Sequence, residues 1–259
     1  MPKTSPLVEG TPSTTEIMIT AIAGMLEGLG HVAIGARSPI PGSAAHLACA
    51  RSGGRMRLSI LGSRAHSSFT DGGRELFDCA GQGRIDAFFL SGGQIDGQAN
   101  INLVGIGDIA AYPRAEARFP GSFGSAYLYF VVPRVILFHQ EHSPRTLPAK
   151  VDFVSAPGTS APEVYRPGGP YALVTSLSAF RFDRGRGRFS LASTHPGVSA
   201  AQVRSATGFD YDAPASVPVT PSPDSDTLAL LRTQVAALIA DTYPAFAART
   251  CGVSVPKSA

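Results

Sequence analysis

The sequence predicts an α/β protein with an open, mostly parallel sheet, flanking helices and a second half that is richer in strands. The chain has 259 residues, of which 44% are hydrophobic and 16% are charged, so it can bury a sizeable core. Helix-like and strand-like segments alternate over its first third, as in a parallel sheet. The run from Ile85 to Leu90 is continuously apolar, which is typical of a strand buried on both faces. We expect a single domain over residues 13–259, preceded by a flexible tail at 1–12.

The first helix is predicted to begin at the capping-box pattern Ser13-Thr14-Thr15-Glu16 and to end at the glycines Gly28 and Gly30. Its apolar face would carry four residues spaced by four, namely Ile17, Ala21, Met25 and Leu29. The elements expected next are a strand at 31–35, a turn at 39–42, a helix at 43–51, a strand at 56–61, a loop at 62–70, a helix near 75–82 and a strand at 85–90.

The second half is expected to hold mostly short strands. A glycine-rich turn at 120–126 leads into the apolar run Tyr127 to Val132, which we interpret as β-structure that anchors the turn at a sheet edge. Further strands are expected at 101–104, 135–138, 151–154, 171–176, 179–182 and 189–193. Four prolines between Pro214 and Pro223 predict an extended connector. The last helix is expected from Asp224 to Ala240, with one apolar stripe formed by Leu228, Leu231, Val235 and Leu238.

Charge and cysteine content exclude several classes of protein. The net charge is only +3 and the arginines are scattered, apart from a cluster at 181–188, so we expect no nucleic-acid partner. Cys49, Cys79 and Cys251 lie far apart without metal-ligand spacing, which favours free thiols over a disulfide framework. The chain shows neither a signal peptide nor a run of about 18 apolar residues. We therefore expect a cytoplasmic protein without membrane contact.

Two segments have the composition of ligand-facing loops. Ser91-Gly92-Gly93-Gln94 follows the buried strand at its carboxyl end, the edge where open parallel sheets bind ligands. Gln94 is a candidate contact there, and the glycines either approach a ligand or simply permit a turn. In the glycine-rich turn, Gly121, Ser122 and Gly124 expose backbone amides that an anion would meet. The three polar residues Asp96, Asn100 and Asn102 are expected to fix the first loop by side-chain to backbone hydrogen bonds.

Several blocks of the sequence, in order, resemble one enzyme family. The blocks include PGSFGSA at 120–126, KVDFVSAPG at 150–158 and LSGGQIDGQANIN at 90–102. Four shorter blocks follow them, namely GGPY at 168–171, FRFD at 180–183, STHPGV at 193–198 and TGFD at 207–210. Together they resemble the β-type subunit of class I coenzyme A (CoA) transferases, the group of the glutaconate CoA-transferase B subunit, over about residues 14–232.

The resemblance implies a CoA-transferase-like (NagB/RpiA/CoA transferase type) α/β fold and an enzyme active only as a complex. An α-type subunit would be the partner, in a heterodimer or heterotetramer, and the active site would lie between the two chains. The substrate would be an acyl-CoA thioester, with no bound cofactor and no metal. Gly121, Ser122 and Gly124 would face the CoA or the oxyanion side. In the family's usual mechanism, a glutamate of the β-type subunit attacks the acyl-CoA and then holds CoA as a glutamyl thioester.

The sequence departs from that pattern where the chemistry is expected. The glutamate should stand near Leu61 to Arg64, but no Asp or Glu occurs from Gly28 through Thr70. Arg64 and His66 are the candidates in that loop, although a guanidinium is no nucleophile and an imidazole gives only a labile acyl intermediate. Phe123 and Tyr127 also stand where the family typically has a second glycine and an acid.

Three functions remain open after this departure. The first is a β-type subunit that acts on an acyl-CoA without the glutamyl-CoA mechanism. The second is a hydrolase or lyase subunit that acts on a cyclic or diketone acyl-CoA, as in a branch of the family that degrades steroid rings, lacks the β-subunit glutamate and uses a carboxylate of the α-type partner. The third is a non-catalytic chain that binds CoA esters or stabilises a partner.

Two histidine-containing patterns are interpreted as structural. His139-Gln140-Glu141-His142 ends a strand and lacks the helix with two histidines four residues apart of zinc proteases, so we expect no metal site. His195 precedes Pro196-Gly197 and is expected to be a hydrogen-bonded residue of a turn.

Overall fold

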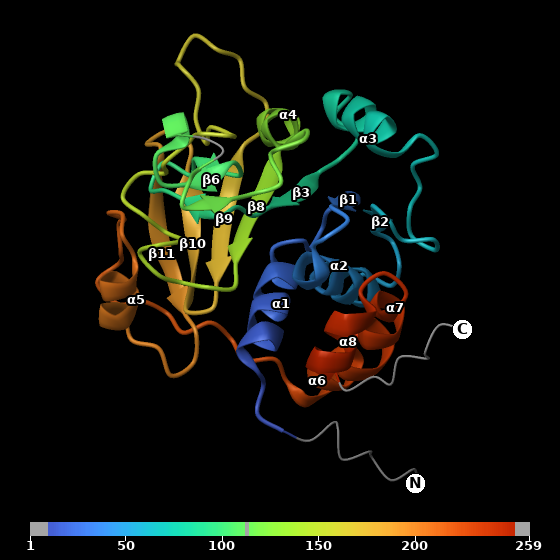
Figure 1. The fold of residues 1–259 in the computed structure, drawn as a ribbon. Helices are drawn as coiled ribbons and strands as arrows, with labels where there is room; N and C mark the ends of the chain where they lie inside the picture. The colour runs from blue at the N-terminus through green and yellow to red at the C-terminus, as the bar shows by residue number, and fades with distance from the viewer. Residues whose placement is uncertain (1–9, 112–113, 252–259) are drawn as a thin grey trace, which may run out of the picture. The chain divides into compact units, whose positions relative to one another are not determined.

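The computed structural model of the chain describes residues 10–111 and 114–251, and most of the predicted tail at 1–12 lies outside these ranges. The side chains of Ile109 and Cys251 are also outside the described part. Contacts within the chain define two compact units (Figure 1). Unit 1 combines Met1–Gly72 with Pro221–Ala259, and unit 2 is Gly73–Thr220.

Unit 1 contains two parallel strands and the helices packed on them. Its elements are α1 (Thr14–Gly24), β1 (His31–Ile34), α2 (Pro39–Arg51), β2 (Arg57–Ile60), α6 (Ser225–Leu230), the π-helical turn η2 (Leu231–Val235), α7 (Ala236–Ala240) and α8 (Pro244–Cys251). Strands β1 and β2 pair in parallel, with His31 opposite Arg57 at one end and Ile34 opposite Ile60 at the other. All four residues of β1 are buried, and α2 packs against both strands as well as against α1 and α7. The alternation of helix and strand predicted from the sequence is confirmed here.

Helix α1 begins as predicted, but its buried face differs from the predicted one. The Ser13 hydroxyl accepts a hydrogen bond from the Glu16 amide, and the Glu16 carboxylate accepts one from the Ser13 amide, which completes the capping box. The helix is apolar on most sides, so several stripes fit its pattern equally well. The residues actually buried include Met18, Ile19, Ile22, Ala23 and Leu26, whereas Ala21, Met25 and Leu29 of the predicted stripe are half-buried.

Helix α2 starts four residues earlier than predicted. Residues 39–42, predicted to form a turn, are its first turn, with Ser38 at the N-cap. Proline is tolerated there because the first amides of a helix have no partner within the helix. Gly42 is required by packing, since a Cβ at this position would lie 2.9 Å from the Tyr243 ring of the segment before α8.

The C-terminal helical segment is longer and less regular than predicted. Asp224 caps it by accepting a hydrogen bond from the Thr227 amide, and α8 follows as a further helix. The predicted stripe is right for Leu228, Leu231 and Val235 but wrong for Leu238, because Ile239 is buried instead. The π-helical turn adds a residue to one turn and so rotates the following residues about the helix axis.

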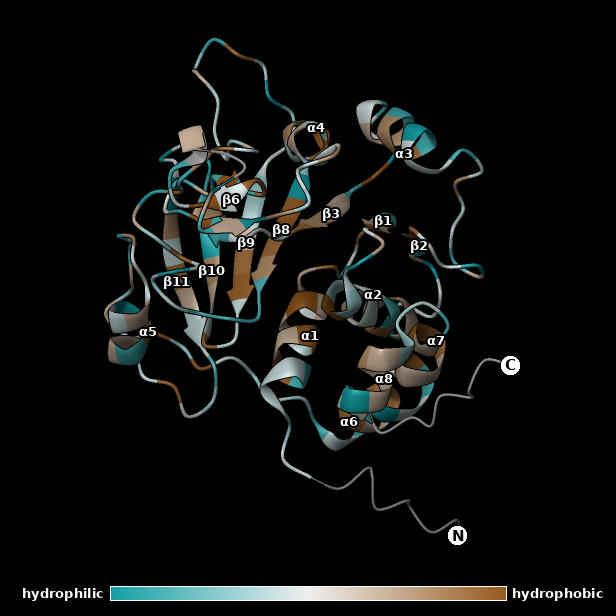
Figure 2. Ribbon diagram, viewed as in Figure 1, coloured by the Kyte–Doolittle hydropathy of each residue, from teal (hydrophilic) through white to brown (hydrophobic). Residues whose placement is uncertain are grey.

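Unit 2 contains a run of paired strands in the order β11-β10-β9-β8-β3 (Figure 1). Its elements are α3 (Gly72–Gly81, which starts at the boundary), β3 (Ala87–Leu90), β4 (Gln94–Ile95), β5 (Ile101–Asn102), β6 (Gly105–Ile106), η1 (Ile109–Ala111), β7 (Ala117–Arg118), α4 (Ser125–Val131), β8 (Arg134–His139), β9 (Pro170–Thr175), β10 (Ser178–Asp183), β11 (Arg188–Thr194) and α5 (Ala200–Ala206). Strands β3, β8 and β9 are parallel, and β10 and β11 are antiparallel. Figure 2 shows the apolar character of β3, β8 and β9, and most residues of these strands are buried.

Two strand predictions in unit 2 are wrong. The run Tyr127 to Val132 belongs mainly to helix α4, because periodicity alone does not separate a short apolar strand from a buried helix. Residues 151–154 form a loop, since side chains rather than a neighbouring strand satisfy the backbone there. The Val151 amide donates to the Asp96 carboxylate at 3.4 Å, and the Asp152 amide donates to Gln94 Oε1 at 2.9 Å.

The expected α/β class with parallel strands, flanking helices and a β-rich second half is confirmed. Cys49 and Cys79 carry free thiols. Across the described ranges, every helix is too short or too polar to cross a lipid bilayer.

Candidate functional site

The loop after β2 is held against the two strands of unit 1 by its own backbone. The Leu61 amide donates to the Ile34 carbonyl at 3.0 Å, and the Ile60 amide donates to the His66 carbonyl at 2.8 Å. Ser63 is buried, and its hydroxyl accepts a hydrogen bond from the His66 amide at 3.1 Å. These bonds fix the loop so that Arg64 is exposed and His66 is half-buried.

A chain of hydrogen bonds beneath this loop was not foreseen from the sequence. His31 Nε2 and Ser59 Oγ lie 2.8 Å apart, and Ser59 Oγ lies 2.5 Å from Ser68 Oγ. Ser59 is fully buried, while Ser68 is half-buried in the loop. The three residues come from two strands and a loop, so their meeting depends on the register of β1 and β2 rather than on local spacing.

The chemical groups of the loop remain those expected from the sequence. With no Asp or Glu between Gly28 and Thr70, the loop offers hydroxyl, imidazole and guanidinium groups but no carboxylate. Its imidazole, that of His66, lies edge-on against His46 of α2, with ring centroids 4.7 Å apart. Within the described ranges, no three His, Cys, Asp or Glu side chains gather as a metal site requires.

The Ser91 to Gln94 segment of unit 2 follows β3 at its carboxyl end, as predicted. Gln94 is buried and its amide is already used: Nε2 donates to Asp152 at 3.2 Å, and Oε1 accepts from Asn102 Nδ2 at 2.8 Å. A Cβ on Gly92 would lie 2.9 Å from the Asn102 carbonyl, and one on Gly93 would collide with the Phe119 ring. The glycines therefore permit close packing, and the Ser91 side chain is half-buried.

The predicted loop-fixing residues do what the sequence indicated. The Asp96 carboxylate accepts hydrogen bonds from the Gln98 and Asn100 amides, both at 3.0 Å. Asn102 Oδ1 accepts from the Val104 amide at 3.0 Å. This prediction is confirmed.

In the glycine-rich turn, the three candidate residues differ from one another. The Gly121 amide donates to the Leu103 carbonyl at 3.0 Å, so the expectation that this amide is exposed to an anion is wrong. Gly121 has a φ of 99°, a conformation that glycine adopts without strain. Ser122 and Gly124 are half-buried, and a Cβ on Gly124 would collide with the Phe77 ring.

Three aromatic rings surround the glycine-rich turn. Phe77 of α3 lies 5.6 Å from Phe123 and 5.9 Å from Tyr127 between ring centroids. Phe123 is 89% exposed and has a φ of 44°, which is unusual for a residue with a side chain. The two residues that depart from the family's pattern therefore meet the same partner ring, and they make the surface of this turn aromatic.

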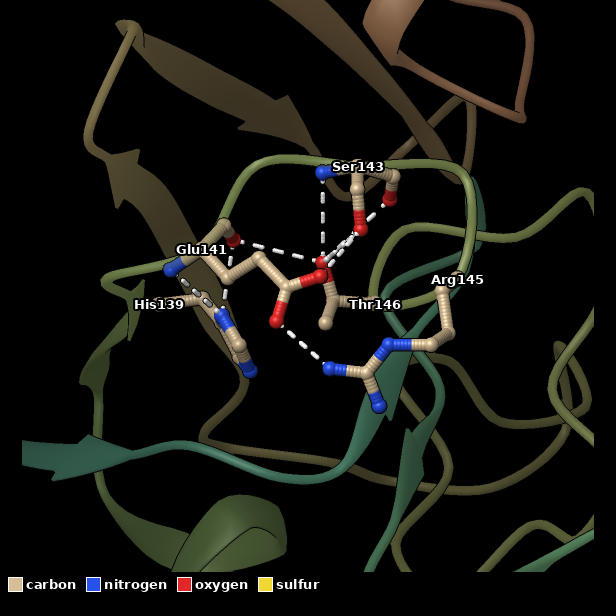
Figure 3. Close-up of polar contacts among 5 residues, drawn as sticks. All are labelled: His139, Glu141, Ser143, Arg145 and Thr146. Carbon is tan, nitrogen blue, oxygen red and sulfur yellow. Dashed lines mark hydrogen bonds and ion pairs between the residues drawn. The ribbon is translucent and has the colours of Figure 1, made fainter.

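A polar cluster follows β8 at the same edge of the sheet (Figure 3). His139 Nδ1 lies 2.7 Å from the Glu141 carbonyl, and the Glu141 carboxylate accepts from Ser143 Oγ at 2.6 Å and pairs with Arg145 at 2.5 Å. The hydrogen bonds from Ser143 and Arg145 hold the pKa of Glu141 below its ordinary value. Burial lowers the pKa of His139. Glu141 is thus an exposed, ionised carboxylate that the sequence analysis did not single out.

The other two histidines of the sequence patterns serve structure. His142 lies with Nδ1 2.7 Å from Thr175 Oγ1 and Nε2 2.8 Å from Thr207 Oγ1. His195 lies with Nδ1 3.0 Å from Thr220 Oγ1 and Nε2 2.8 Å from the Thr175 carbonyl. All four ring nitrogens are occupied, so the structural interpretation of His195 is confirmed and His142 has no nitrogen left for a metal.

The predicted site residues fall into two groups. Arg64 and His66 belong to unit 1. The Ser91–Gln94 and Gly121–Gly124 segments belong to unit 2. Both are hydrogen-bonded to the stretch Asn102-Leu103: the Gly93 amide donates to the Asn102 carbonyl, and the Gly121 amide donates to the Leu103 carbonyl. The two loops of unit 2 are therefore neighbours at the carboxyl ends of its parallel strands, where α/β proteins bind ligands.

This fold, with ligand-type loops at the carboxyl edge of a parallel sheet, defines an α/β protein of the CoA-transferase type. The family model for coenzyme A transferase matches residues 18–206, and the chain belongs to that family. The resemblance to a β-type subunit is also confirmed. The B subunit of the 3-oxoadipate CoA-transferase from Pseudomonas knackmussii (strain DSM 6978 / CCUG 54928 / LMG 23759 / B13) is 34% identical over 157 residues, which is 58% of each chain.

A second curated relative is the cholesterol ring-cleaving hydrolase IpdB subunit of Rhodococcus jostii (strain RHA1). It is 29% identical over 163 residues, which cover 61% of this chain and 62% of the relative. The chain thus matches about three fifths of the length of each of these relatives.

Solved structures support the fold over most of the chain. The IpdAB structure from Rhodococcus jostii RHA1 has a TM-score of 0.75 and the glutaconate CoA-transferase structure from Acidaminococcus fermentans one of 0.74. Each is 24% identical, with 86% of this chain and 94% of that chain covered. The decarboxylase AibA/AibB has a TM-score of 0.72 at 24% identity and covers 87% of this chain and 98% of its own.

Proposed function

We propose that this chain is the β-type subunit of an enzyme that acts on an acyl-CoA thioester together with an α-type subunit, without supplying a glutamyl nucleophile itself. The observation that carries the proposal is the loop after β2, which a family member would use to present an acid and which here holds Ser63, Arg64 and His66. The relative named as one subunit of a 3-oxoadipate CoA-transferase supports the acyl-CoA substrate and the partner.

The role of the chain would then be to bind and orient the thioester, while a carboxylate of the partner takes part in the chemistry. Ser91, Ser122 and Gly124 are the proposed contacts to the CoA ester, because Gln94 and the Gly121 amide are engaged within unit 2. In unit 1, His66 and Arg64 are separate candidate contacts, since a half-buried imidazole and an exposed guanidinium can stabilise developing negative charge. The complex would need no bound cofactor and would work in a reducing cytoplasm.

A second candidate is a hydrolase or lyase subunit acting on a cyclic or diketone acyl-CoA. Two observations favour it: the relative whose name describes a ring-cleaving hydrolase, and the structural likeness to a decarboxylase. Such a subunit would support attack by water or cleavage of a carbon-carbon bond. CoA is then not passed to a carboxylic acid acceptor, so a glutamyl-CoA intermediate is not required.

The proposal is tested by producing the chain with a candidate α-type subunit and measuring both association and turnover. We expect the two chains to co-purify, and we expect turnover by the pair to exceed that of either chain alone by at least about 100-fold, because half of a shared site lacks reacting groups. Two assays separate the candidates: CoA transfer to 3-oxoadipate from an acyl-CoA donor, and CoA or product release from a cyclic diketone thioester.

If the pair forms and the chain binds an acyl-CoA, but the pair is inactive in both assays, the proposed catalytic function is wrong. The non-catalytic function of binding CoA esters would then replace it. A chain that forms a stable homo-oligomer and ignores every α-type subunit would contradict the proposed partnership.

A further inference from the structure

Unit 1 contains a pocket beside β2, and His66 of the loop after β2 is part of its lining. Its volume is about 510 Å³, and it is an open pocket lined by the second half of α2, by β2 with the segments before and after it, and by the C-terminal helical segment. Its apolar wall includes Met56, Leu58 and Leu238, and its polar groups include His46, His66 and Gln234. A cavity of this size and character is typical of a small-molecule site.

His46 is the unusual member of this wall. It is only 4% exposed, yet its ring nitrogens have no hydrogen-bond partner among the residues that the structure describes. Ser178 Oγ is the buried side-chain atom without a partner in the described ranges, so the His46 nitrogens are not sealed off and are open to a hydrogen bond with a molecule in the cavity. Burial, with a smaller contribution from the neighbouring His66, lowers the pKa of His46 to about 4, which keeps the ring neutral near neutral pH.

The lining of the pocket restricts the chemistry of that partner. No Lys, Arg, Asp or Glu lines it, so a phosphate or a free carboxylate would be buried without a counter-charge. CoA is disfavoured for the same reason. Two neutral imidazoles and the Gln234 amide offer both donors and acceptors, which match a hydroxyl group, and the rest of the wall matches an apolar body.

We propose that this pocket binds a neutral, mostly apolar small molecule bearing a hydroxyl group, of the phenol or alicyclic alcohol class, with its hydroxyl on His46. The site goes beyond the proposed acyl-CoA function and does not depend on it, since every lining residue belongs to this chain. His66 lies both in the lining of the pocket and in the loop after β2, where its backbone amide donates a hydrogen bond to the Ser63 hydroxyl.

The test uses the full chain near neutral pH with three probes of one shape: naphthol, naphthalene and naphthoate. We expect naphthol to bind about fivefold to tenfold more tightly than naphthalene, as a net gain of about 1 kcal/mol for one hydrogen bond implies. Naphthoate is expected to bind more weakly than both. Naphthol is also expected to shift the imidazole nitrogen resonances of His46 in an NMR spectrum.

Two variants test the location. In His46→Leu the preference for naphthol over naphthalene should fall to about one, with naphthalene binding retained, and Ala50→Phe should fill the pocket and abolish binding of all three probes. The proposal is overturned if no probe binds the wild-type chain, if naphthoate binds best, or if His46→Leu keeps the preference for naphthol. It is also overturned if Ala50→Phe, folded by circular dichroism, binds the probes like wild type. Because the isolated chain is used, these results are independent of whether the pair with an α-type subunit is active.

Discussion

Replacing Arg232 with methionine is expected to lower the free energy of unfolding by about 3–5 kcal/mol. Arg232 of the π-helical turn forms two hydrogen bonds to Glu16 of α1, at 2.6 and 3.0 Å, and the two side chains are 13% and 4% exposed. Burial raises the pKa of Glu16, but the hydrogen bonds from Arg232 and Ser13 outweigh it, so the pKa is lowered and the carboxylate stays charged. Removing the cation leaves a buried charge without its partner. Urea unfolding at neutral pH measures the loss.

Two controls separate this effect from a general cost of removing arginine. Arg145→Met breaks the exposed pair with Glu141, whose side chains are 60% and 45% exposed, and should cost less than about 1 kcal/mol. The double variant Glu16→Leu/Arg232→Met removes both charges and should recover a large part of the stability lost in the single variant. If Arg232→Met costs no more than Arg145→Met, the buried pair between Arg232 and Glu16 does not stabilise the protein more than an exposed pair does, and the prediction is wrong.

Acidification is expected to destabilise the protein by about 2 kcal/mol for each of His46 and His142 between about pH 7 and about pH 5. Both pKa values are lowered from 6.5 to about 4, chiefly by burial, with smaller contributions from His66 on His46 and from His139 and His195 on His142. The unfolded chain takes up these protons below about pH 6.5, whereas the folded chain resists them down to about pH 4. Stability is therefore present above pH 6.5 and is lost as the pH falls through this window.

The matched variants for this prediction are His46→Leu and His142→Leu. Each should reduce the pH dependence by about 2 kcal/mol, since the titrating group is gone. Their stabilities near neutral pH should differ, because His142 shares hydrogen bonds with Thr175 and Thr207 whereas His46 has no such partner in the described part of the chain. We expect His142→Leu to be destabilising and His46→Leu to be neutral or stabilising. A free energy of unfolding that is equal at the two pH values in the wild type would contradict this account.

The sequence allowed prediction of the features that depend on neighbouring residues. The capping box at Ser13 and Glu16 and the fully buried strand β3 were predicted correctly, because a cap and an apolar run are local patterns. The absence of an acid in the loop after β2 could be read from the sequence directly once the resemblance to the family was recognised.

Other features depend on contacts that spacing does not reveal. The apolar run of helix α4 is too short to be distinguished from a strand by its pattern, and Leu238 is misplaced because a π-helical turn inserts a residue. Gln94 has the position of a ligand contact, and only the fold shows that Asn102 and Asp152 already engage its amide. The contact between His46 and His66 requires α2 to pack on β2, and no local pattern in the sequence indicates it.

The glycine-rich turn shows how the family scaffold has been altered in this chain. Phe123 and Tyr127 meet Phe77 of α3, and Gly124 provides the space in which the Phe77 ring lies. An aromatic surface now stands where the family typically carries small and acidic residues.

The central claim is that this chain supports acyl-CoA chemistry without a nucleophilic carboxylate of its own. The most direct measurement is mass spectrometry of this chain after the active pair has been incubated with its acyl-CoA and treated with borohydride or hydroxylamine. The account predicts turnover with every Asp and Glu of this chain unmodified. A reduced or hydroxamate-bearing carboxylate on this chain, at Asp71, Glu75, Glu141 or any other position, would contradict it.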